Sequence, residues 1–224
     1  MEQTLLANRE ELECDTSFKT EEDPIVPVTV TGKKGYLWIK RGFDVLVSLA
    51  ALLILCIPLL LICLAVRLET PGPAIFKQKR MGRNGKVFTI YKIRTMKLSA
   101  PSEVGAQDFP NQKQHITKLG EFLRHSSIDE LPQLINVLKG DMSLVGYRPI
   151  CLTEEALNDL RMRYGVFALR PGITGLAQVK GRDQLHYTQK VEMDAQYVSQ
   201  CSLKMDCWCL LQTVRAVITG EGVN

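Results

Sequence analysis

Two adjacent carboxylates, Asp129 and Glu130, are the residues of this chain best suited to chemistry. An ionised aspartate can attack phosphorus and form an acyl phosphate, and a neighbouring glutamate can hold Mg²⁺, which neutralises phosphate oxygens. A structural interpretation is also open, because Ser127 and Glu130 have the spacing of a capping box. Pro132 instead favours a helix that starts later, at Asp129 or Leu131, where a missing N–H costs nothing. Both carboxylates then lie at a helix entrance, where they stay ionised and exposed N–H groups attract phosphate.

Two glycine-containing segments further along could bind an anion. Residues 139–149 present Arg148 from a loop, and its planar guanidinium suits a phosphate or a carboxylate. The alternative for this arginine is a surface ion pair after an ordinary turn. Residues 170–182 contain glycines that let backbone N–H groups approach an anion, without P-loop or dinucleotide spacing. Their candidate substrate-binding side chains are Arg170, Thr174, Gln178 and Arg182.

An apolar run of 22 residues, Val45 to Val66, is long enough to cross a bilayer core of about 30 Å as one helix. Pro58 predicts a bend near its centre, because proline removes a backbone donor and clashes one turn back. Lysines and arginines flank both ends, and such residues favour the cytoplasmic side of a membrane. Two arrangements remain open: a single kinked helix that spans the membrane, and a re-entrant segment that turns at Pro58 and returns.

The charges of the chain are unevenly divided around a net charge of +4 over 224 residues. Residues 1–32 carry eight acidic side chains and are predicted to be a disordered cytoplasmic tail. Residues 33–98 carry thirteen lysines and arginines, which favours anionic headgroups or phosphorylated substrates as partners. Nucleic acid is disfavoured, because these basic residues cluster at the membrane segment rather than along a soluble helix.

The seven cysteines form no Cys-x-x-Cys pair and are odd in number, which disfavours a disulfide framework or a zinc site. Acidic residues stand where a signal peptide would need basic ones, so no signal peptide is expected. We therefore divide the chain into the tail, residues 1–32, the basic flank and membrane segment, residues 33–69, and a cytoplasmic catalytic domain, residues 70–224.

Helices outweigh strands in the expected secondary structure of the cytoplasmic domain. An apolar stripe at helical spacing predicts a helix from Leu131 to Gly140. Two short β stretches joined by a glycine-containing turn predict a hairpin over residues 74–93, and residues 170–182 are predicted to be irregular. Four further helices are expected, at residues 116–124, 154–164, 190–199 and 203–219. The last has an apolar face that suits the core or a membrane interface.

Taken in order, the motifs of the chain resemble those of one family, the monotopic phosphoglycosyl transferases, also called bacterial sugar transferases. The similarity runs from about Lys40 to the C-terminus and rests on Lys40-Arg41-x-Phe43-Asp44, the proline-broken apolar segment, Phe76-x-Gln78-x-Arg80-x-Gly82, Tyr91-Lys92-x-Arg94-Thr95-Met96, Ser127-x-Asp129-Glu130-Leu131-Pro132-Gln133-Leu134, Lys139-Gly140-Asp141-Met142-Ser143-x-Val145-Gly146 and Arg170-Pro171-Gly172-Ile173-Thr174-Gly175. Two departures stand out. Tyr147 replaces the first proline of a Pro-Arg-Pro motif, which predicts a looser Arg148 loop, and Ile57 replaces a serine before the membrane proline.

The resemblance implies a fold and an activity. The fold would be α-rich and monotopic, with a re-entrant membrane helix, a small cytoplasmic domain with amphipathic interfacial helices, and little β structure. The activity would be transfer of a sugar phosphate from a nucleoside diphosphate sugar, usually a UDP-sugar, to undecaprenyl phosphate, with release of UMP. Asp129 would become phosphoglycosylated, and Glu130 would bind Mg²⁺ beside it. The enzyme would lie among membrane lipids on the cytoplasmic face of the bacterial inner membrane.

The remaining site predictions combine the motifs with the residues themselves. Arg124, Arg148 and Arg170 are expected to contact substrate phosphates, and Lys92 and Arg94 are further candidates for substrate binding. Two other functions stay open: a membrane-anchored phosphohydrolase, in which water attacks the aspartyl phosphate, and a non-catalytic module that binds nucleotide sugars. The sequence sets neither the sugar nor the oligomeric state, so a homo-oligomer is also open.

Overall fold

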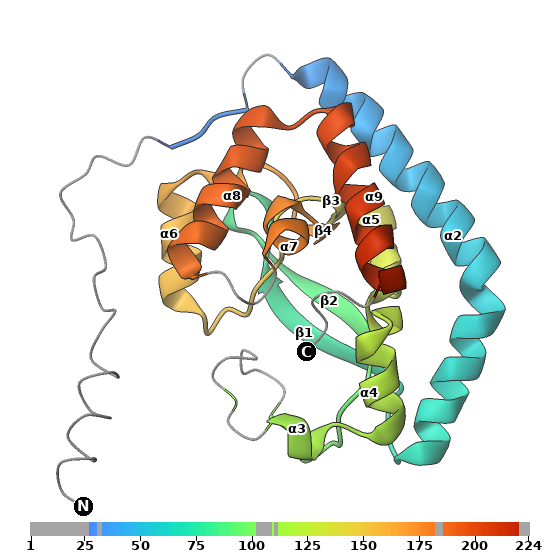
Figure 1. The fold of residues 1–224 in the computed structure, drawn as a ribbon. Helices are drawn as coiled ribbons and strands as arrows, with labels where there is room; N and C mark the ends of the chain where they lie inside the picture. The colour runs from blue at the N-terminus through green and yellow to red at the C-terminus, as the bar shows by residue number, and fades with distance from the viewer. Residues whose placement is uncertain (1–26, 31–32, 102–108, 110–111, 182–185, 220–224) are drawn as a thin grey trace, which may run out of the picture.

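The computed structural model describes residues 27–30, 33–101, 109, 112–181 and 186–219. The predicted acidic tail, except for residues 27–30, and the candidate substrate residue Arg182 lie outside these described residues. Within them, a long N-terminal helix wraps around one side of a smaller body of short helices and two small sheets (Figure 1).

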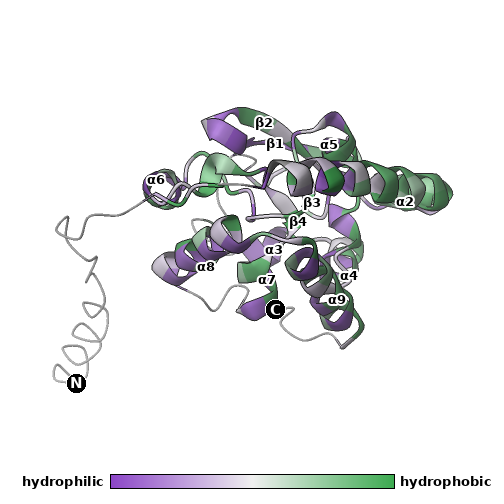
Figure 2. Ribbon diagram, turned by 90° about the horizontal axis from the view of Figure 1, so that it is seen from above, coloured by the Kyte–Doolittle hydropathy of each residue, from purple (hydrophilic) through white to green (hydrophobic). Residues whose placement is uncertain are grey.

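The long helix, α2 (Lys34–Glu69), contains the whole apolar run. It continues through Pro58, so the prediction of a helix broken at this proline is wrong. Figure 1 shows that it curves around the body instead of projecting away from it. It is the one helix among the described residues that is long and apolar enough to cross a membrane. Residues with exposed side chains give most of its length an apolar surface (Figure 2); they include Leu46, Leu53, Ile54, Ile57, Leu60, Leu61, Leu64 and Leu68.

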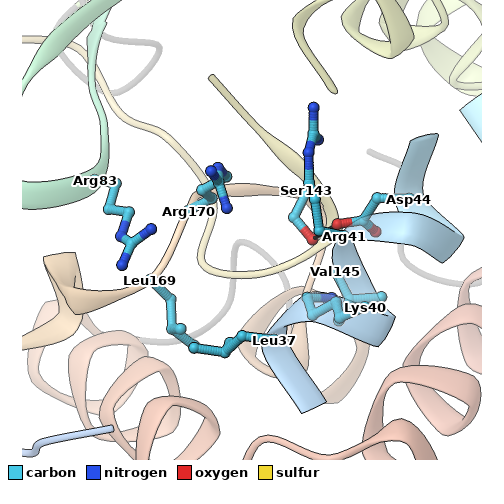
Figure 3. A pocket seen from close by; sticks show the side chains of 9 residues that line it. All are labelled: Leu37, Lys40, Arg41, Asp44, Arg83, Ser143, Val145, Leu169 and Arg170. Atoms are coloured by element: carbon cyan, nitrogen blue, oxygen red, sulfur yellow. Dashed lines mark hydrogen bonds between the residues drawn. The ribbon is translucent and has the colours of Figure 1, made fainter. Parts of the chain in front are cut away.

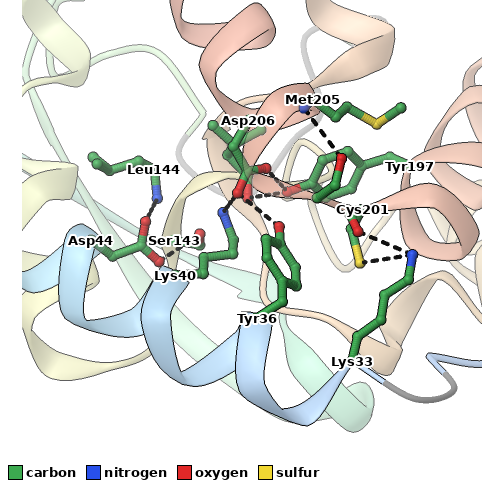
Figure 4. Close-up of polar contacts among 12 residues, drawn as sticks. Lys33, Tyr36, Lys40, Asp44, Ser143, Leu144, Tyr197, Cys201, Met205 and Asp206 are labelled. Atoms are coloured by element: carbon green, nitrogen blue, oxygen red, sulfur yellow. Dashed lines mark hydrogen bonds and ion pairs between the residues drawn. The ribbon is translucent and has the colours of Figure 1, made fainter.

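A polar cluster fixes the first half of α2 to the C-terminal helices α8 (Tyr187–Gln200) and α9 (Leu203–Thr219) (Figure 4). The Asp206 carboxylate accepts hydrogen bonds from the Tyr36 hydroxyl at 2.7 Å, the Lys40 ammonium at 3.0 Å and the Tyr197 hydroxyl at 2.6 Å. Lys40 is 7% exposed. Lys40 therefore pairs with a buried carboxylate. Its position beside the apolar run had favoured contact with lipid headgroups instead.

The second half of α2 and its C-terminal end are also attached to the body. Val66 packs with Ile93 and Leu123 in a small apolar cluster. The Arg94 guanidinium donates to the carbonyl oxygens of Thr70 and Pro71, both at 2.7 Å, just beyond the helix end. These carbonyls follow the last turn of the helix and have no intrahelical donors, so the arginine acts as a C-terminal cap.

The predicted hairpin is present and its first strand is longer than expected. β1 (Ile75–Met81) pairs antiparallel with β2 (Val87–Ile93), in a register that runs from Ile75 opposite Ile93 to Met81 opposite Val87. A short 3-10 turn, η1 (Arg83–Gly85), joins them, with Asn84 in the left-handed region at φ 55°. The hairpin brings Lys92 close to the segment that carries the two carboxylates.

The expected helices of the domain are present, with ends shifted by a few residues. The other elements in chain order are α3 (Gln112–His115), α4 (Lys118–His125), η2 (Ile128–Glu130), α5 (Gln133–Lys139), β3 (Ser143–Val145), α6 (Glu155–Arg163), η3 (Val166–Ala168), β4 (Gly172–Thr174) and α7 (Leu176–Lys180). The prediction of an irregular segment at residues 170–182 is wrong, because β4 pairs parallel with β3 and α7 follows it. Glycine is required here: a Cβ at Gly172 would lie 2.1 Å from the backbone nitrogen of Gly146.

Candidate active site

The two carboxylates lie on η2, a single 3-10 turn between α4 and α5. Ser127, which precedes it, has a left-handed backbone at φ 56°, and its side chain makes no capping hydrogen bond. The capping-box interpretation is therefore wrong. α5 starts after Pro132, which confirms a later helix start, but its N-terminal cap is Pro132 and not Asp129 or Leu131 as predicted. The 3-10 turn leaves Asp129 only 8% exposed.

Glu130 is held by two cations from different parts of the fold. Its Oε1 atom accepts from the Lys92 ammonium of β2 at 2.7 Å and from the Arg148 guanidinium at 3.2 Å. Burial opposes ionisation of this carboxyl, but the two positive charges and their hydrogen bonds outweigh it and lower its pKa to about 2. Glu130 therefore carries its negative charge at any physiological pH.

Asp129 has the opposite electrostatic balance. Burial raises the pKa of its carboxyl, and the neighbouring Glu130 charge raises it further, against the opposing effects of Lys92, Arg124 and Arg148. Within the described part of the chain no hydrogen bond is made to this carboxylate. An aspartate that is buried, unbonded and more basic than usual has the properties of a nucleophile.

A small, open cavity lies beside Glu130 and is lined by Lys92, Arg148 and Arg80. Arg80 of β1 was not among the predicted site residues, although it belongs to a matched motif. Its guanidinium contacts the Gln78 side chain at 2.5 Å and the Pro149 carbonyl at 3.3 Å, and burial lowers its pKa. The cavity thus joins a carboxylate to three cationic side chains, which suits a ligand with several negative charges.

Asn136 is a second residue that sequence reasoning missed. It is fully buried on α5, where its side-chain oxygen accepts from the Tyr91 N–H at 3.1 Å and its amide donates to the Thr89 carbonyl at 2.7 Å. These bonds fasten α5 to β2 next to Lys92. The sequence pattern gave no signal for it, because Asn136 lies outside the predicted apolar stripe of Leu131, Leu134, Ile135 and Leu138. Its burial comes from the fold, which supplies the polar partners that a buried amide needs.

Arg124 lies beside the carboxylates as predicted, whereas Arg170 lies elsewhere. The Arg124 side chain donates to the Thr95 hydroxyl at 2.9 Å, and its charge acts on Asp129. Arg170 lines a different open cavity, together with Arg41 and Arg83 (Figure 3). Their guanidinium groups point in different directions in this view.

The arginines of this second cavity have structural partners. Arg170 donates to the Gly140 carbonyl at 2.8 Å, and Arg41 donates to the Val137 carbonyl at 2.7 Å. These carbonyls form the C-terminal end of α5, where cationic side chains are stabilising. In this structure Arg170 therefore caps a helix, and its expected contact with substrate phosphate stays a prediction.

The other predicted substrate residues are also placed away from the two carboxylates. Arg94 caps α2, as described above. The Thr174 hydroxyl lies 2.6 Å from the Thr213 hydroxyl of α9, and Gln178 donates to the Ile173 carbonyl at 3.0 Å. Of the predicted residues, Lys92, Arg124 and Arg148 are the ones that the fold brings to Asp129 and Glu130.

The residues at this site fit a magnesium ion that is shared with a substrate. The described residues contain no group of three or more acidic, histidine or cysteine ligands. Mg²⁺, however, is commonly bound by one or two carboxylates together with substrate phosphates and water. Lys92 and Arg148 both contact Oε1 of Glu130. Oε2 of Glu130 and the Asp129 carboxylate make no bond within the described chain and could supply the oxygen ligands.

Comparison with known proteins identifies the family. The family model described as bacterial sugar transferase matches residues 35–220, which include every residue of the site. The chain belongs to the bacterial sugar transferase family. It is an enzyme, and the family resemblance of its motifs is confirmed.

Three relatives show what this bacterial sugar transferase is similar to. It is 41% identical to "Uncharacterized sugar transferase EpsL" of Bacillus subtilis (83% of this chain, 90% of that protein). It is 43% identical to "UDP-glucose:undecaprenyl-phosphate glucose-1-phosphate transferase" of Caulobacter vibrioides (81% and 70%). It is 39% identical to "Galactosyl transferase CpsE" of Streptococcus agalactiae, where the match covers 86% of this chain but only 45% of the relative. The chain thus spans less than half of some relatives.

Proposed function

We propose that this enzyme transfers a sugar 1-phosphate from a UDP-sugar to undecaprenyl phosphate and releases UMP, which starts the synthesis of a polysaccharide or glycoconjugate. The observation that carries the proposal is the pair of adjacent carboxylates, whose pKa values are shifted in opposite directions beside a cationic cavity. Such a separation assigns different roles to two neighbouring acids. The name of the Caulobacter relative, which specifies UDP-glucose and undecaprenyl phosphate, supports this substrate class.

The proposed reaction has two steps. In the first, an Asp129 oxygen attacks the phosphorus that bears the sugar, and the bond from that phosphorus to the bridging oxygen breaks, so that UMP leaves. In the second, an oxygen of the lipid phosphate attacks the same phosphorus and frees Asp129. The soluble donor and the embedded acceptor never occupy the site together, because the aspartate carries the sugar phosphate between the two steps.

The cationic side chains stabilise the charge that moves during these steps. Arg148, Lys92 and Arg80 line the cavity where the diphosphate would bind, and fixed positive charges in a buried site favour a transition state with added negative charge. Asp129 and Glu130 would hold Mg²⁺, which when bound supplies positive charge to the phosphate oxygens. Glu130 itself stays ionised and holds Lys92 and Arg148 in place.

Mass spectrometry and UMP release test the role of Asp129. Enzyme given a UDP-sugar and Mg²⁺ without lipid should release about one equivalent of UMP in a burst and gain the mass of one sugar phosphate. Asp129→Asn should abolish both, because it is nearly isosteric but a poor nucleophile. Asp159→Asn, an exposed aspartate on α6, is the matched control and should behave as the wild type.

Three other results would point to other functions. No adduct, with UMP formed only when lipid phosphate is present, would favour direct transfer from donor to acceptor. Steady release of free sugar phosphate without lipid would favour a phosphohydrolase. Tight binding of the nucleotide sugar with no UMP at all would favour a non-catalytic module.

We further propose that α2 enters and leaves the membrane on the cytoplasmic side. Its first half is attached to α9 through Lys40 and Asp206, and its end is attached through Arg94. A straight spanning helix would separate its two ends by about 30 Å of hydrocarbon. Attachment of both ends to one body supports an arrangement in which both ends of α2 stay on the cytoplasmic side, with the exposed apolar face between them in lipid.

Cysteine accessibility tests this topology. In a background without native cysteines, Thr29→Cys and Lys77→Cys place thiols at exposed positions on either side of α2. Both should be protected from an impermeant thiol reagent in intact cells and should react after lysis. Labelling of one position but not the other in intact cells would establish a spanning helix instead.

A further inference from the structure

The loop that carries Arg148 is held at successive backbone carbonyls. The Tyr147 carbonyl accepts from the Gly172 N–H at 2.8 Å. The Arg148 carbonyl accepts from the Arg161 guanidinium of α6 at 2.7 Å. Because this hydrogen bond is made to the backbone of Arg148, it restrains the Cα atom from which the Arg148 side chain extends. Arg161 therefore influences the position of the Arg148 guanidinium at Glu130 without touching the site.

Arg161 is in turn fixed from two other directions. Its second terminal nitrogen lies 2.6 Å from the Asp194 carboxylate of α8, in an ion pair whose side chains are 3% and 2% exposed. Its guanidinium also lies over the Tyr147 ring, 5.3 Å from the centroid. A planar guanidinium can satisfy a carboxylate, a carbonyl and an aromatic face together, which a lysine ammonium cannot do with the same geometry.

Tyr147 completes this arrangement from within the loop. Its side chain is 1% exposed and meets the Phe167 ring edge-on at 5.5 Å. A buried aromatic side chain restrains the backbone that carries it by packing, whereas a proline does so by a locked φ angle. The structure thus has a packed tyrosine at this position, and the effect of replacing the proline on the Arg148 loop stays a prediction.

We propose that Tyr147, Arg161 and Asp194 form a brace that positions Arg148 for binding of the sugar nucleotide phosphates. This inference rests on the proposed function and adds three positioning residues, none of which lines the cavity. The brace acts only through Arg148. Damage to it should therefore have no further effect once Arg148 has lost its guanidinium.

A double-mutant cycle on the rate tests this dependence. Arg161→Lys and Arg148→Lys should each lower kcat for UMP release from a UDP-sugar, by about 10- to 100-fold for a displaced catalytic group. The double variant should be no slower than Arg148→Lys alone, because both changes remove the same interaction. Arg163→Lys, an exposed arginine on the same helix, is the matched control and should keep the wild-type kcat.

The outcomes separate the brace from the proposed function. Losses that multiply in the double variant, or full activity in Arg161→Lys, would overturn the brace. No UMP release by the wild type would instead remove the proposed function. If Arg161→Lys does not fold, Tyr147→Leu enters the same cycle, since it removes the ring under the guanidinium but keeps an apolar side chain. Additive loss with that variant would overturn the brace equally.

Discussion

At the scale of single residues, the site depends on two neighbouring acids in different surroundings. Glu130 forms ion pairs with Lys92 and Arg148. Asp129 is buried and has no hydrogen-bonding partner in the described chain. Glu130 therefore stays ionised. Burial removes solvent from the Asp129 carboxylate, which raises its pKa and makes it more basic. A substitution that exchanges the two residues would preserve the composition of the site and destroy this division of roles.

The first prediction concerns the pH dependence of the burst of UMP. The Asp129 carboxyl must be ionised to attack, and its pKa is raised above 3.8 by burial and by Glu130. As pH falls, the burst rate should therefore decline at a higher pH than an ordinary aspartate would allow, while Glu130, with a pKa of about 2, stays charged. In Glu130→Gln the residual burst should decline at a lower pH, since the raising charge is gone. Rapid-quench rates across the acid range measure both, and an acid limb at or below pH 3.8 in the wild type would contradict the assignment.

Sequence reasoning selected the candidate site residues from the chemistry of their residue types. Asp129, Glu130 and Arg148 were identified as chemically suited, and the family motifs added Lys92. It proposed Arg94 and Arg170 for substrate binding, and in this structure both guanidinium groups donate to carbonyls at a helix end, which they suit as well as a phosphate. Only the fold decides between these uses, because the carbonyls come from distant segments of the chain.

At the scale of elements, the junction of α5 and β2 brings Lys92 to Glu130. Asn136 makes this junction specific, since its amide satisfies both a donor and an acceptor of β2. An apolar residue would pack there but would leave two backbone groups unpaired.

The second prediction is that Asn136→Ala destabilises the fold by about 2 to 6 kcal/mol, because it leaves two buried groups unpaired and each costs about 1 to 3 kcal/mol. Asn136→Asp should also destabilise it, since a carboxylate would face the Thr89 carbonyl. Thermal or denaturant unfolding in detergent measures both. Ile135→Ala, an exposed neighbour on α5, is the control and should have a small effect. Equal effects at the two positions would show that the asparagine bonds contribute nothing specific.

The elements themselves were predicted unevenly. The helix at residues 203–219 was placed with both of its ends correct, because a long amphipathic stripe is a strong signal. The β3–β4 pair was missed, because each strand has three residues and β4 starts with a glycine that lacks β propensity. Such strands exist because close backbone approach at Gly146 and Gly172 allows them, and that approach involves segments far apart in sequence.

At the scale of the whole molecule, α2 is both the apolar surface of the protein and one wall of its body. The ion pair of Lys40 and Asp206 links α2 to the rest of the body, and its side chains are only 8% and 7% exposed. A buried charge is tolerated only with its partner, so removal of one member should cost more than replacement of both.

The third prediction follows from this pair. Lys40→Met should destabilise the protein by about 3 kcal/mol, because it leaves the Asp206 carboxylate buried without a cation. The double variant Lys40→Met with Asp206→Asn should recover part of the loss, since the amide still bonds to tyrosine hydroxyls. Thermal unfolding in detergent measures the series, with Lys204→Met, an exposed lysine of α9, as the control. A double variant less stable than Lys40→Met would contradict a charge-based link.

The Lys40–Asp206 pair joins residues 166 positions apart, and this has a consequence for how the protein is made. The ribosome delivers α2 first, and the counter-charge of Lys40 is synthesised only after most of the chain has emerged. Until then the helix carries an ammonium on the side that it will later bury. A nascent chain that stops early keeps this charge uncompensated, so quality-control proteases would meet a recognisably unfinished helix. Among the described residues, the last helix to be translated thus supplies the partner of the first.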